Sequence, residues 1–312
     1  MKTITLPHTT LTVPIVVGGM MRIKEMDDDS IRALVRTYLD QEIPFFDHAD
    51  IYGGAYHFCE RRFADAMQWS PAERERVILQ SKCGIVRDSH GTYFDFSREH
   101  IVASVTESLK ALRTDYLDVL LLHRPDSLVE PEEVAAAFDE LAQSGKVRYF
   151  GVSNHTPGQI ELLQKFVRQP LVINQVQLSV TYAPLIAQGV AMNILDADQA
   201  VSRDSGLLDY CRLHDITIQA WSPFQSGFFT GVFLGDPQYA DLNQVLERLA
   251  RKYEVTPMGI ATAWITRHPA NIQVVLGTTK PDRVAAAAAG SEVPLTRSEW
   301  YELFRSAGHI VP

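Results

Sequence analysis

Eight short apolar runs spaced along the whole chain are the feature that most constrains its fold. Each run is rich in Val, Ile or Leu, which is typical of parallel strands that are buried on both faces. The runs cover residues 15–17, 44–48, 77–82, 116–122, 147–152, 171–176, 216–221 and 272–276. They predict the strands of one parallel sheet.

Segments with helix start signals lie between these runs, and the clearest cover residues 27–40, 97–112, 131–143 and 157–167. Two of them open with a proline in the first turn, where the missing N–H costs nothing. Strand followed by helix, repeated eight times, predicts a closed (β/α)8 barrel of the TIM type in the α/β class. The 312 residues show no linker or shift in composition. We therefore expect a single domain over residues 1–312.

Several of the apolar runs end in a polar side chain. Asp47, Lys82 and His123 each come at the end of a predicted strand, and Tyr52 follows Asp47 closely. In a barrel of this type, catalytic residues come from the carboxyl ends of different strands. The four side chains are therefore expected to meet in one site.

The segments around these residues resemble those of the aldo-keto reductases. FFDHADIYGG, SKCG and LLHRPD carry the resemblance first, and YFGVSNHTP, INQVQ, WSPFQSG and VVLGTTKPDR follow in the family's order. Because the seven segments run from near residue 15 to near residue 283, the resemblance covers almost the whole chain. It implies a catalytic tetrad of Asp47, Tyr52, Lys82 and His123.

The tetrad residues suit the reduction of a carbonyl group, which needs a proton donor for the oxygen. A tyrosine, with an ordinary pKa of about 10, holds its proton at neutral pH but releases it reluctantly. A lysine about 4 Å away would favour tyrosinate by about 4 kcal/mol, before burial opposes it. We expect Lys82 to act in this way on Tyr52, Asp47 to hold Lys82 and weaken its effect, and His123 to orient the substrate oxygen.

Strand alternation separates neighbouring side chains onto opposite faces. Asp47 and His48 should therefore diverge, as should Asn174 and Gln175. If Lys82 lines the barrel, the next residue, Cys83, is most simply an inert buried thiol.

Side chains suited to a nicotinamide lie at later strand ends. Ser153, Asn154 and Gln175 supply hydroxyl and amide groups for the carboxamide, and Trp221 supplies a flat face on which the ring can stack. The resemblance assigns the same roles. It also implies cofactor contacts from Gly19, Met20, Met21, Ser222, Pro223, Phe224 and Gly227.

A phosphate site is expected where Gly277, Thr278, Thr279 and Lys280 follow the last strand and precede a helix. Backbone N–H groups, hydroxyls and the cations Lys280 and Arg283 suit a phosphate at a helix N-terminus. In the family this segment holds the adenosine 2′-phosphate, which favours NADP (as NADPH) over NAD. The GxGxxG motif of a Rossmann domain is absent.

Two departures from the family pattern concern the adenosine end of the cofactor. Ala286 and Ala287 stand where many members carry Glu and Asn. We expect looser cofactor binding as a consequence.

Long connections follow several strands, over residues 84–96, 178–205 and 222–238. Their aromatic residues either line an apolar substrate pocket or pack on one another. These aromatic residues are Tyr93, Phe94, Phe96, Phe224, Phe228 and Phe229.

Bulk properties narrow the partners and the compartment. A net charge of -9 argues against nucleic acid or an anionic membrane as the main partner. We see no signal peptide and no apolar run long enough to span a membrane. The 3 widely spaced cysteines suit a reducing compartment. A cytoplasmic monomer acting on a small-molecule carbonyl substrate is the default expectation.

Two other functions were weighed. A metal-dependent hydrolase could use Asp47, His48, Asp50 and His123, but opposite strand faces separate the first two, and we expect no metal. A non-catalytic NADP-binding regulatory subunit, like the channel β-subunits that share this fold, stays open as an alternative. The favoured hypothesis is an NADP-dependent oxidoreductase that reduces an aldehyde or ketone to an alcohol.

Overall fold

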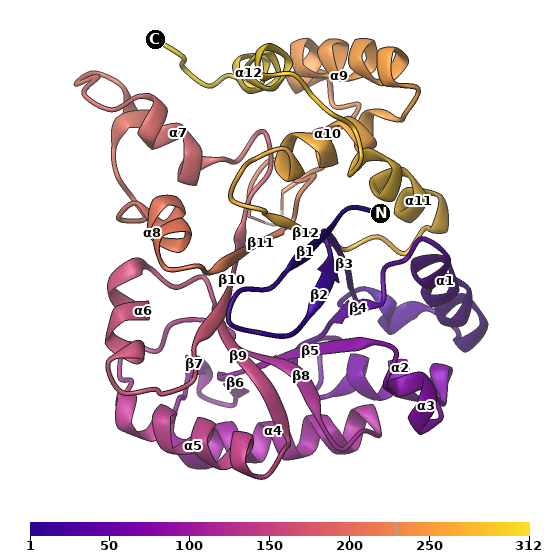
Figure 1. Cartoon of the computed structure of the whole chain (residues 1–312), viewed down its shortest axis with the longest axis vertical. Coiled ribbons are helices and arrows are strands. Elements are labelled where there is room, and N and C mark those ends of the chain that lie inside the picture. Colours follow the sequence, from indigo (N-terminus) through magenta and orange to yellow (C-terminus); the bar gives the residue numbers. More distant parts are fainter. Residues whose placement is uncertain (229) are drawn as a thin grey trace.

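The computed structural model describes residues 1–228 and 230–312. In this part of the chain eight parallel strands close into a barrel, and Figure 1 shows the helices arranged around the ring of strands. The predicted (β/α)8 fold is therefore confirmed. The barrel strands are β3 (Val16–Gly19), β4 (Phe45–Asp47), β5 (Ile78–Cys83), β8 (Leu117–Leu122), β9 (Val147–Ser153), β10 (Leu171–Gln177), β11 (Thr217–Trp221) and β12 (Gln273–Leu276).

Each predicted strand agrees with an observed one to within two residues at either end, because burial on both faces imposes the apolar runs that were detected. The strands join in chain order, and β12 pairs with β3 to close the ring. Figure 1 places the two termini on the same side of the barrel as α10, α11 and α12.

The helices cover the outside of the barrel, and at least one helix lies between each two successive barrel strands. They are α1 (Asp28–Asp40), α2 (Phe58–Met67), α3 (Pro71–Arg74), α4 (Arg98–Leu112), α5 (Pro131–Gln143), α6 (Pro157–Gln164), α7 (Pro184–Val190), α8 (Leu207–Leu213), α9 (Ala240–Tyr253), α10 (Pro257–Thr266), α11 (Pro281–Gly290) and α12 (Arg297–Ser306). Short 3-10 turns lie at η1 (Ile23–Glu25), η2 (Asp198–Ala200) and η3 (Pro237–Tyr239).

The predicted helix starts are confirmed by the caps. The Asp27 side chain accepts from the N–H of Ser30 at the start of α1, and Ser97 caps α4 in the same way. Pro131 and Pro157 are the first helical residues of α5 and α6. α6 ends at Gln164 rather than at residue 167, and a turn follows in which the N–H groups of Phe166 and Val167 both donate to the Leu163 carbonyl.

Two antiparallel hairpins were not predicted. The first joins β1 (Thr3–Thr5) to β2 (Thr12–Pro14) and lies in front of the barrel strands in Figure 1. Its Pro14 carbonyl accepts a 2.7 Å hydrogen bond from Gln273, the first residue of β12. The hairpin therefore packs at the amino ends of the strands. A strand of three residues is too short to show a recognisable alternation of apolar and polar side chains.

The second hairpin occupies most of the connection expected over residues 84–96. It joins β6 (Ile85–Asp88) to β7 (Gly91–Phe94), which pair with each other and not with the barrel. Tyr93 and Phe94 are exposed, whereas Phe96 is buried and stacks on His155 with ring centroids 6.1 Å apart. The strands of this hairpin are mostly exposed, so their sequence contains no apolar run from which they could have been predicted.

No helix in the described residues has both the length and the apolar character that a membrane crossing requires.

The packing of α10 on α11 gives a testable prediction, because these helices touch through two glycines. A Cβ placed on Gly290 would collide with the backbone of Gly259. We expect Gly290→Ala to lower the free energy of unfolding by about 1–3 kcal/mol, because backbone cannot move aside as a side chain can. In the control, Gly158→Ala in α6 meets nothing within 4 Å and should be neutral or stabilising by up to about 1 kcal/mol. Urea unfolding measures both, and equal effects would contradict the prediction.

Candidate active site

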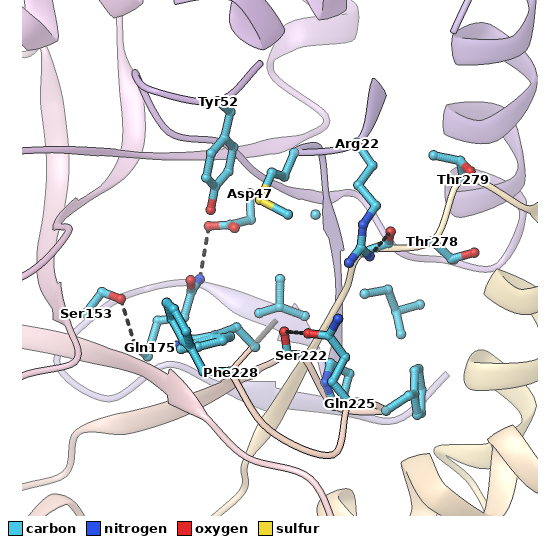
Figure 2. A pocket seen from close by; sticks show the side chains of 18 of the residues that line it. Arg22, Asp47, Tyr52, Ser153, Gln175, Ser222, Gln225, Phe228, Thr278 and Thr279 are labelled. Carbon is cyan, nitrogen blue, oxygen red and sulfur yellow. Dashed lines mark hydrogen bonds between the residues drawn. The ribbon is translucent and has the colours of Figure 1, made fainter. Parts of the chain in front are cut away.

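A cavity of about 600 Å³ opens at the carboxyl ends of the barrel strands. Its wall includes strand-end residues from around the ring, among them Gly19, Asp47, Ser153, Trp221 and Leu276. Figure 2 shows Tyr52 and Asp47 on one side of this cavity and Thr278 and Thr279 on another. Most of the polar strand ends identified from the sequence therefore face one cavity, and Lys82 is buried beside it.

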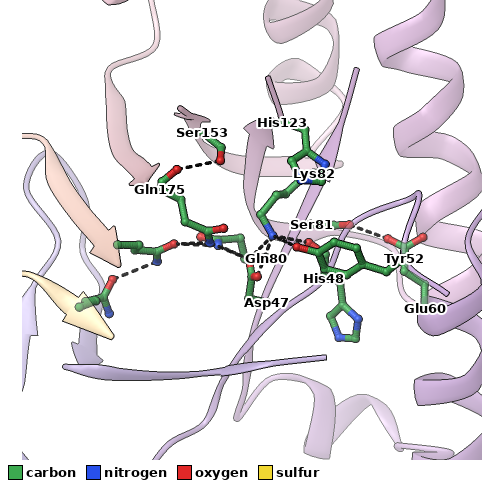
Figure 3. Close-up of polar contacts among 12 residues, drawn as sticks. Asp47, His48, Tyr52, Glu60, Gln80, Ser81, Lys82, His123, Ser153 and Gln175 are labelled. Carbon is green, nitrogen blue, oxygen red and sulfur yellow. Dashed lines mark hydrogen bonds and ion pairs between the residues drawn. The ribbon is translucent and has the colours of Figure 1, made fainter. Parts of the chain in front are cut away.

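The Lys82 ammonium lies at the centre of the polar contacts in Figure 3. It donates to both carboxylate oxygens of Asp47 at 2.7 Å and to the backbone carbonyl of His48 at 2.9 Å. It is also 3.1 Å from the Tyr52 hydroxyl. Asp47 and Lys82 are buried, whereas Tyr52 and His123 line the cavity.

The strand register explains this arrangement. Asp47 is the last residue of β4 and pairs with Gln80 of β5, so that Lys82, two residues further along β5, is on the same face and higher in the barrel. Tyr52 follows on the loop after β4. That loop turns at Gly53, whose φ of +98 is a conformation that side chains disfavour.

The predicted alternation of faces is confirmed. The His48 ring packs outside the barrel against Phe63 of α2, with centroids 4.7 Å apart. Asn174 donates to the carbonyl of His155, away from the barrel interior that holds Gln175. Cys83 is buried, and burial raises the pKa of its thiol well above the ordinary value, which fits an inert group.

The pKa of Tyr52 shifts in the direction opposite to the one that Lys82 alone would cause. Burial raises the pKa of the Tyr52 hydroxyl and outweighs the nearby Lys82 charge, which acts in the opposite direction. The Asp47 carboxylate also raises it. Burial opposes the charge on Lys82, but Asp47 and Tyr52 together raise the pKa of the ammonium. The site therefore holds a protonated tyrosine beside a charged lysine.

His123 follows β8, and its ring meets that of Tyr52 edge to face with centroids 5.9 Å apart. Burial depresses its pKa well below 6.5, and the charges of Lys82, Arg124 and Arg87 depress it further. Its buried Nδ1 has no hydrogen-bond partner among the described residues. The imidazole is therefore neutral at pH 7.

A chain of glutamine amides supports the Asp47 carboxylate from inside the barrel. Gln80 and Gln175 each donate to Asp47 Oδ1, at 2.5 and 3.0 Å, and each also donates to Gln219 Oε1 at 2.9 Å. Gln219 in turn donates to Gln273 at 3.0 Å, and Gln273 donates to the Pro14 carbonyl. Continuous hydrogen bonds thus connect the carboxyl end of the barrel with the hairpin at its other end.

Gln80, Gln219 and Gln273 were not predicted as residues of the site. A signal was available, because Gln80 and Gln219 stand two residues before Lys82 and Trp221. Residues at this spacing share a strand face. A polar residue inside an apolar run, on the same face as a site residue, indicates an interior polar network.

The side chains predicted for a nicotinamide lie together beside the tetrad. The Trp221 indole N–H donates to Asn154 at 3.0 Å, and Asn154 donates to Ser153 at 2.8 Å. Ser153 donates to the Gln175 carbonyl at 2.8 Å. Both donors of the Gln175 amide group point into the glutamine chain, and its Oε1 has no donor among the described residues. An acceptor is thus left for a ligand with an amide N–H.

The predicted phosphate segment forms another wall of the cavity. Gly277, Thr278, Thr279, Lys280 and Arg283 all line it, and α11 begins at Pro281. Among the described residues, neither Lys280 nor Arg283 forms an ion pair. These donors and free cations fit the phosphates of a dinucleotide.

Most of the predicted cofactor residues line the cavity, including Gly19, Met21, Ser222, Pro223 and Phe224. Two do not: Met20 is fully buried in the core, and Gly227 lies outside the wall. Ala286 and Ala287 also lie outside it.

Three arginines line the cavity and were not identified from the sequence. Arg22 donates to the Gly277 carbonyl at 2.7 Å, whereas Arg87 and Arg124 lie near His123. Arginines that follow strand ends carry no apolar pattern, so only the folded chain places them in the site.

Only some of the aromatic residues in the long connections line the cavity. Phe224 and Phe228 line the cavity, but Tyr93, Phe94 and Phe96 do not. Phe229 lies outside the described residues. No group of acidic, histidine or cysteine side chains in the described chain could hold a metal ion.

Comparisons with known proteins agree with this geometry. A family model described as "Aldo/keto reductase family" matches residues 14–306. An uncharacterised oxidoreductase of Bacillus subtilis, YcsN, is 36% identical over 308 residues, which are 95% of each chain. A 6-dehydroglucose reductase of Agrobacterium fabrum is 34% identical and covers 94% of this chain and 93% of its own. The crystal structure of a thermostable aldo-keto reductase with the inhibitor epalrestat has a TM-score of 0.77 at 22% identity, covering 98% of this chain and 100% of its own, and so shows the same fold.

The burial of His48 predicts how stability depends on pH. Burial lowers the pKa of His48 to about 4, and neither ring nitrogen has a partner among the described residues. Below pH 6.5 His48 becomes protonated in the unfolded chain, whereas in the folded chain it stays neutral until the pH approaches 4. Stability is therefore lost as the pH falls from 6.5 towards 4, by about 3 kcal/mol for this residue.

Urea unfolding at pH 7 and pH 4.5 tests this effect. His48→Leu should remove most of that loss, whereas Phe63→Leu alters the same contact without a titrating group and should lower stability equally at both pH values. An unchanged pH dependence in His48→Leu would contradict the assignment.

Proposed function

Because the chain belongs to the aldo/keto reductase family, we propose that it is an NADP-dependent oxidoreductase that reduces an aldehyde or ketone to an alcohol, with Tyr52 as the general acid. We take residues 1–312 as one barrel domain for this function. The observation that carries the proposal is the buried Asp47–Lys82 pair, with its ammonium 3.1 Å from a tyrosine hydroxyl that faces the cavity.

The chain's own residues account for the movement of the proton. Burial keeps Tyr52 protonated until a substrate oxygen gains negative charge beside it. Lys82 then stabilises the tyrosinate that remains, and Asp47 and the His48 carbonyl hold the ammonium in place. His123, as a neutral imidazole, donates a ring N–H that orients the carbonyl oxygen.

NADPH, when bound, supplies the hydride that the carbonyl carbon receives. Gln175 Oε1, with Ser153 and Asn154, would hold the carboxamide, and the Trp221 face would pack on the nicotinamide ring. Gly277, Thr278, Thr279, Lys280 and Arg283 would hold phosphates, and Arg22 stands beside them. The remaining proposed contacts come from Gly19, Met21, Ser222, Pro223 and Phe224, which line the same cavity.

The proposed setting is a cytoplasmic monomer that acts on a small carbonyl compound. All three cysteines are free and buried, which fits a reducing compartment. A non-catalytic NADP-binding subunit would keep the cofactor wall without needing a general acid. Turnover that depends on Tyr52 separates the two functions.

Activity with a reactive aromatic aldehyde tests the general acid. Tyr52→Phe removes the proton donor, so NADPH oxidation should fall by a factor of about 10²–10⁴ while NADPH still quenches tryptophan fluorescence. Tyr149→Phe is the matched control, because its hydroxyl bonds Thr10 in the hairpin at the opposite end of the barrel. Equal activity in wild type and Tyr52→Phe would refute the proposal, and NADPH binding with no turnover in wild type would favour the regulatory subunit.

The cofactor wall predicts both preference and strength of binding. NADPH should bind more tightly than NADH, and Lys280→Ala should weaken NADPH about tenfold with little effect on NADH, because a charged hydrogen bond to the 2′-phosphate is lost. Lys110→Ala, on the outer surface of α4, is the control.

Because Ala286 and Ala287 offer no polar contact, the Kd for NADPH should be micromolar or weaker. Fluorescence titration measures the Kd values of NADPH and NADH for wild type and for both variants. A wild-type Kd for NADPH well below micromolar would contradict the expected loose binding.

A further inference from the structure

The cavity wall is strongly positive although the protein as a whole is acidic. Among the described lining residues the cations are Arg22, Arg87, Arg124, Lys280 and Arg283, and the one acid is Asp47, which Lys82 neutralises. Arg22, Lys280 and Arg283 belong to the wall around Gly277. Arg87 and Arg124 lie instead at the tetrad, where both charges act on His123. The cofactor wall therefore does not account for these two arginines.

Arg124 directly follows His123 and is partly buried. Its guanidinium lies over the rings of Trp221 and Phe228, 6.0 and 5.8 Å from their centroids. It forms no hydrogen bond or ion pair with the described residues. These distances are within the range of cation–π attraction, which leaves the N–H donors of the guanidinium for another group.

The acids that stand close to these arginines in the sequence are already engaged. Asp126 accepts from the backbone N–H groups of Phe96 and Leu128, at 3.1 and 2.8 Å. Asp88, the neighbour of Arg87, accepts from the His90 N–H and the Tyr93 hydroxyl, at 2.7 and 3.1 Å. Both carboxylates serve local turns. The two arginines consequently face the cavity without a counter-ion from the described chain.

We propose that the physiological substrate is a small carbonyl compound with an anionic group, and that Arg124 binds this group while Arg87 adds charge at the cavity mouth. The inference rests on the proposed reductase function and names the class of its substrate. A planar carboxylate or a phosphate can accept two parallel N–H donors from one guanidinium. Because Arg124 and His123 line the same cavity, one small molecule can present its carbonyl group to His123 and its anionic group to Arg124.

Matched pairs of aldehydes test the proposal in the full-length enzyme with NADPH. The first pair is 4-carboxybenzaldehyde and its neutral methyl ester, and the measured quantity is the ratio of their kcat/KM values. Wild type should favour the acid by about 10- to 100-fold, the range expected for a charged hydrogen bond. Arg124→Met should bring the ratio close to one, and Arg124→Lys should retain part of the preference.

Further variants separate a specific contact from a general effect. Arg168→Met, on the outer surface, should keep the wild-type ratio. Arg87→Met should lower the ratio less than Arg124→Met, because Arg87 is exposed. A second pair, glyceraldehyde 3-phosphate and glyceraldehyde, identifies the anion: a larger ratio here assigns a phosphate, and a smaller one assigns a carboxylate.

The outcomes distinguish this inference from the function on which it rests. Reduction of the neutral ester by wild type without preference for the acid would overturn the inference and leave the reductase function intact. A ratio in Arg124→Met equal to that of wild type would also overturn it. Failure to reduce any of the aldehydes would overturn both.

Discussion

The buried ion pair between Lys82 and Asp47 is the interaction on which the rest of the site depends. Two charges held inside a barrel are costly unless every remaining donor and acceptor is engaged. Here the ammonium is satisfied by two carboxylate oxygens, a backbone carbonyl and the Tyr52 hydroxyl. The carboxylate receives the amides of Gln80 and Gln175 from below. The position of the Tyr52 hydroxyl therefore follows from a hydrogen-bonded network inside the barrel.

The charged groups of this network also influence the protonation states of their neighbours. Asp47 keeps Lys82 charged, and Lys82 offsets part of the cost of ionising a buried tyrosine. Burial keeps His123 neutral, and the charges of Lys82, Arg124 and Arg87 act in the same direction. One cluster of positive charge thus favours ionisation of Tyr52, adds to the effect of burial on His123 and leaves the cavity attractive to anions. The negative net charge of -9 belongs to the outer surface and gives no indication of this interior.

The barrel was predictable because its strands are buried on both faces, which forces an apolar run wherever one occurs. The polar residue at the end of each run then indicated the site, as Asp47, Lys82 and His123 show. The hairpins were not predictable, since β1, β2, β6 and β7 pair only with each other and leave no continuous apolar pattern. The direction of the Tyr52 pKa shift also escaped the sequence, because burial and charge oppose one another there and only the packing decides which is larger.

By itself, then, the sequence determined the barrel and indicated the strand-end residues and the segment before α11 that line its cavity. It could do so because burial and strand alternation act on residues that are close together in the chain. Only the tertiary structure decided that Gln80, Gln175, Gln219 and Gln273 join into one chain, and that Arg87 and Arg124 lack a counter-ion in the described chain. Those facts depend on which side chains from distant segments meet and on which acids are already engaged elsewhere. No local pattern records either, because a hydrogen bond between distant strands constrains only the folded chain.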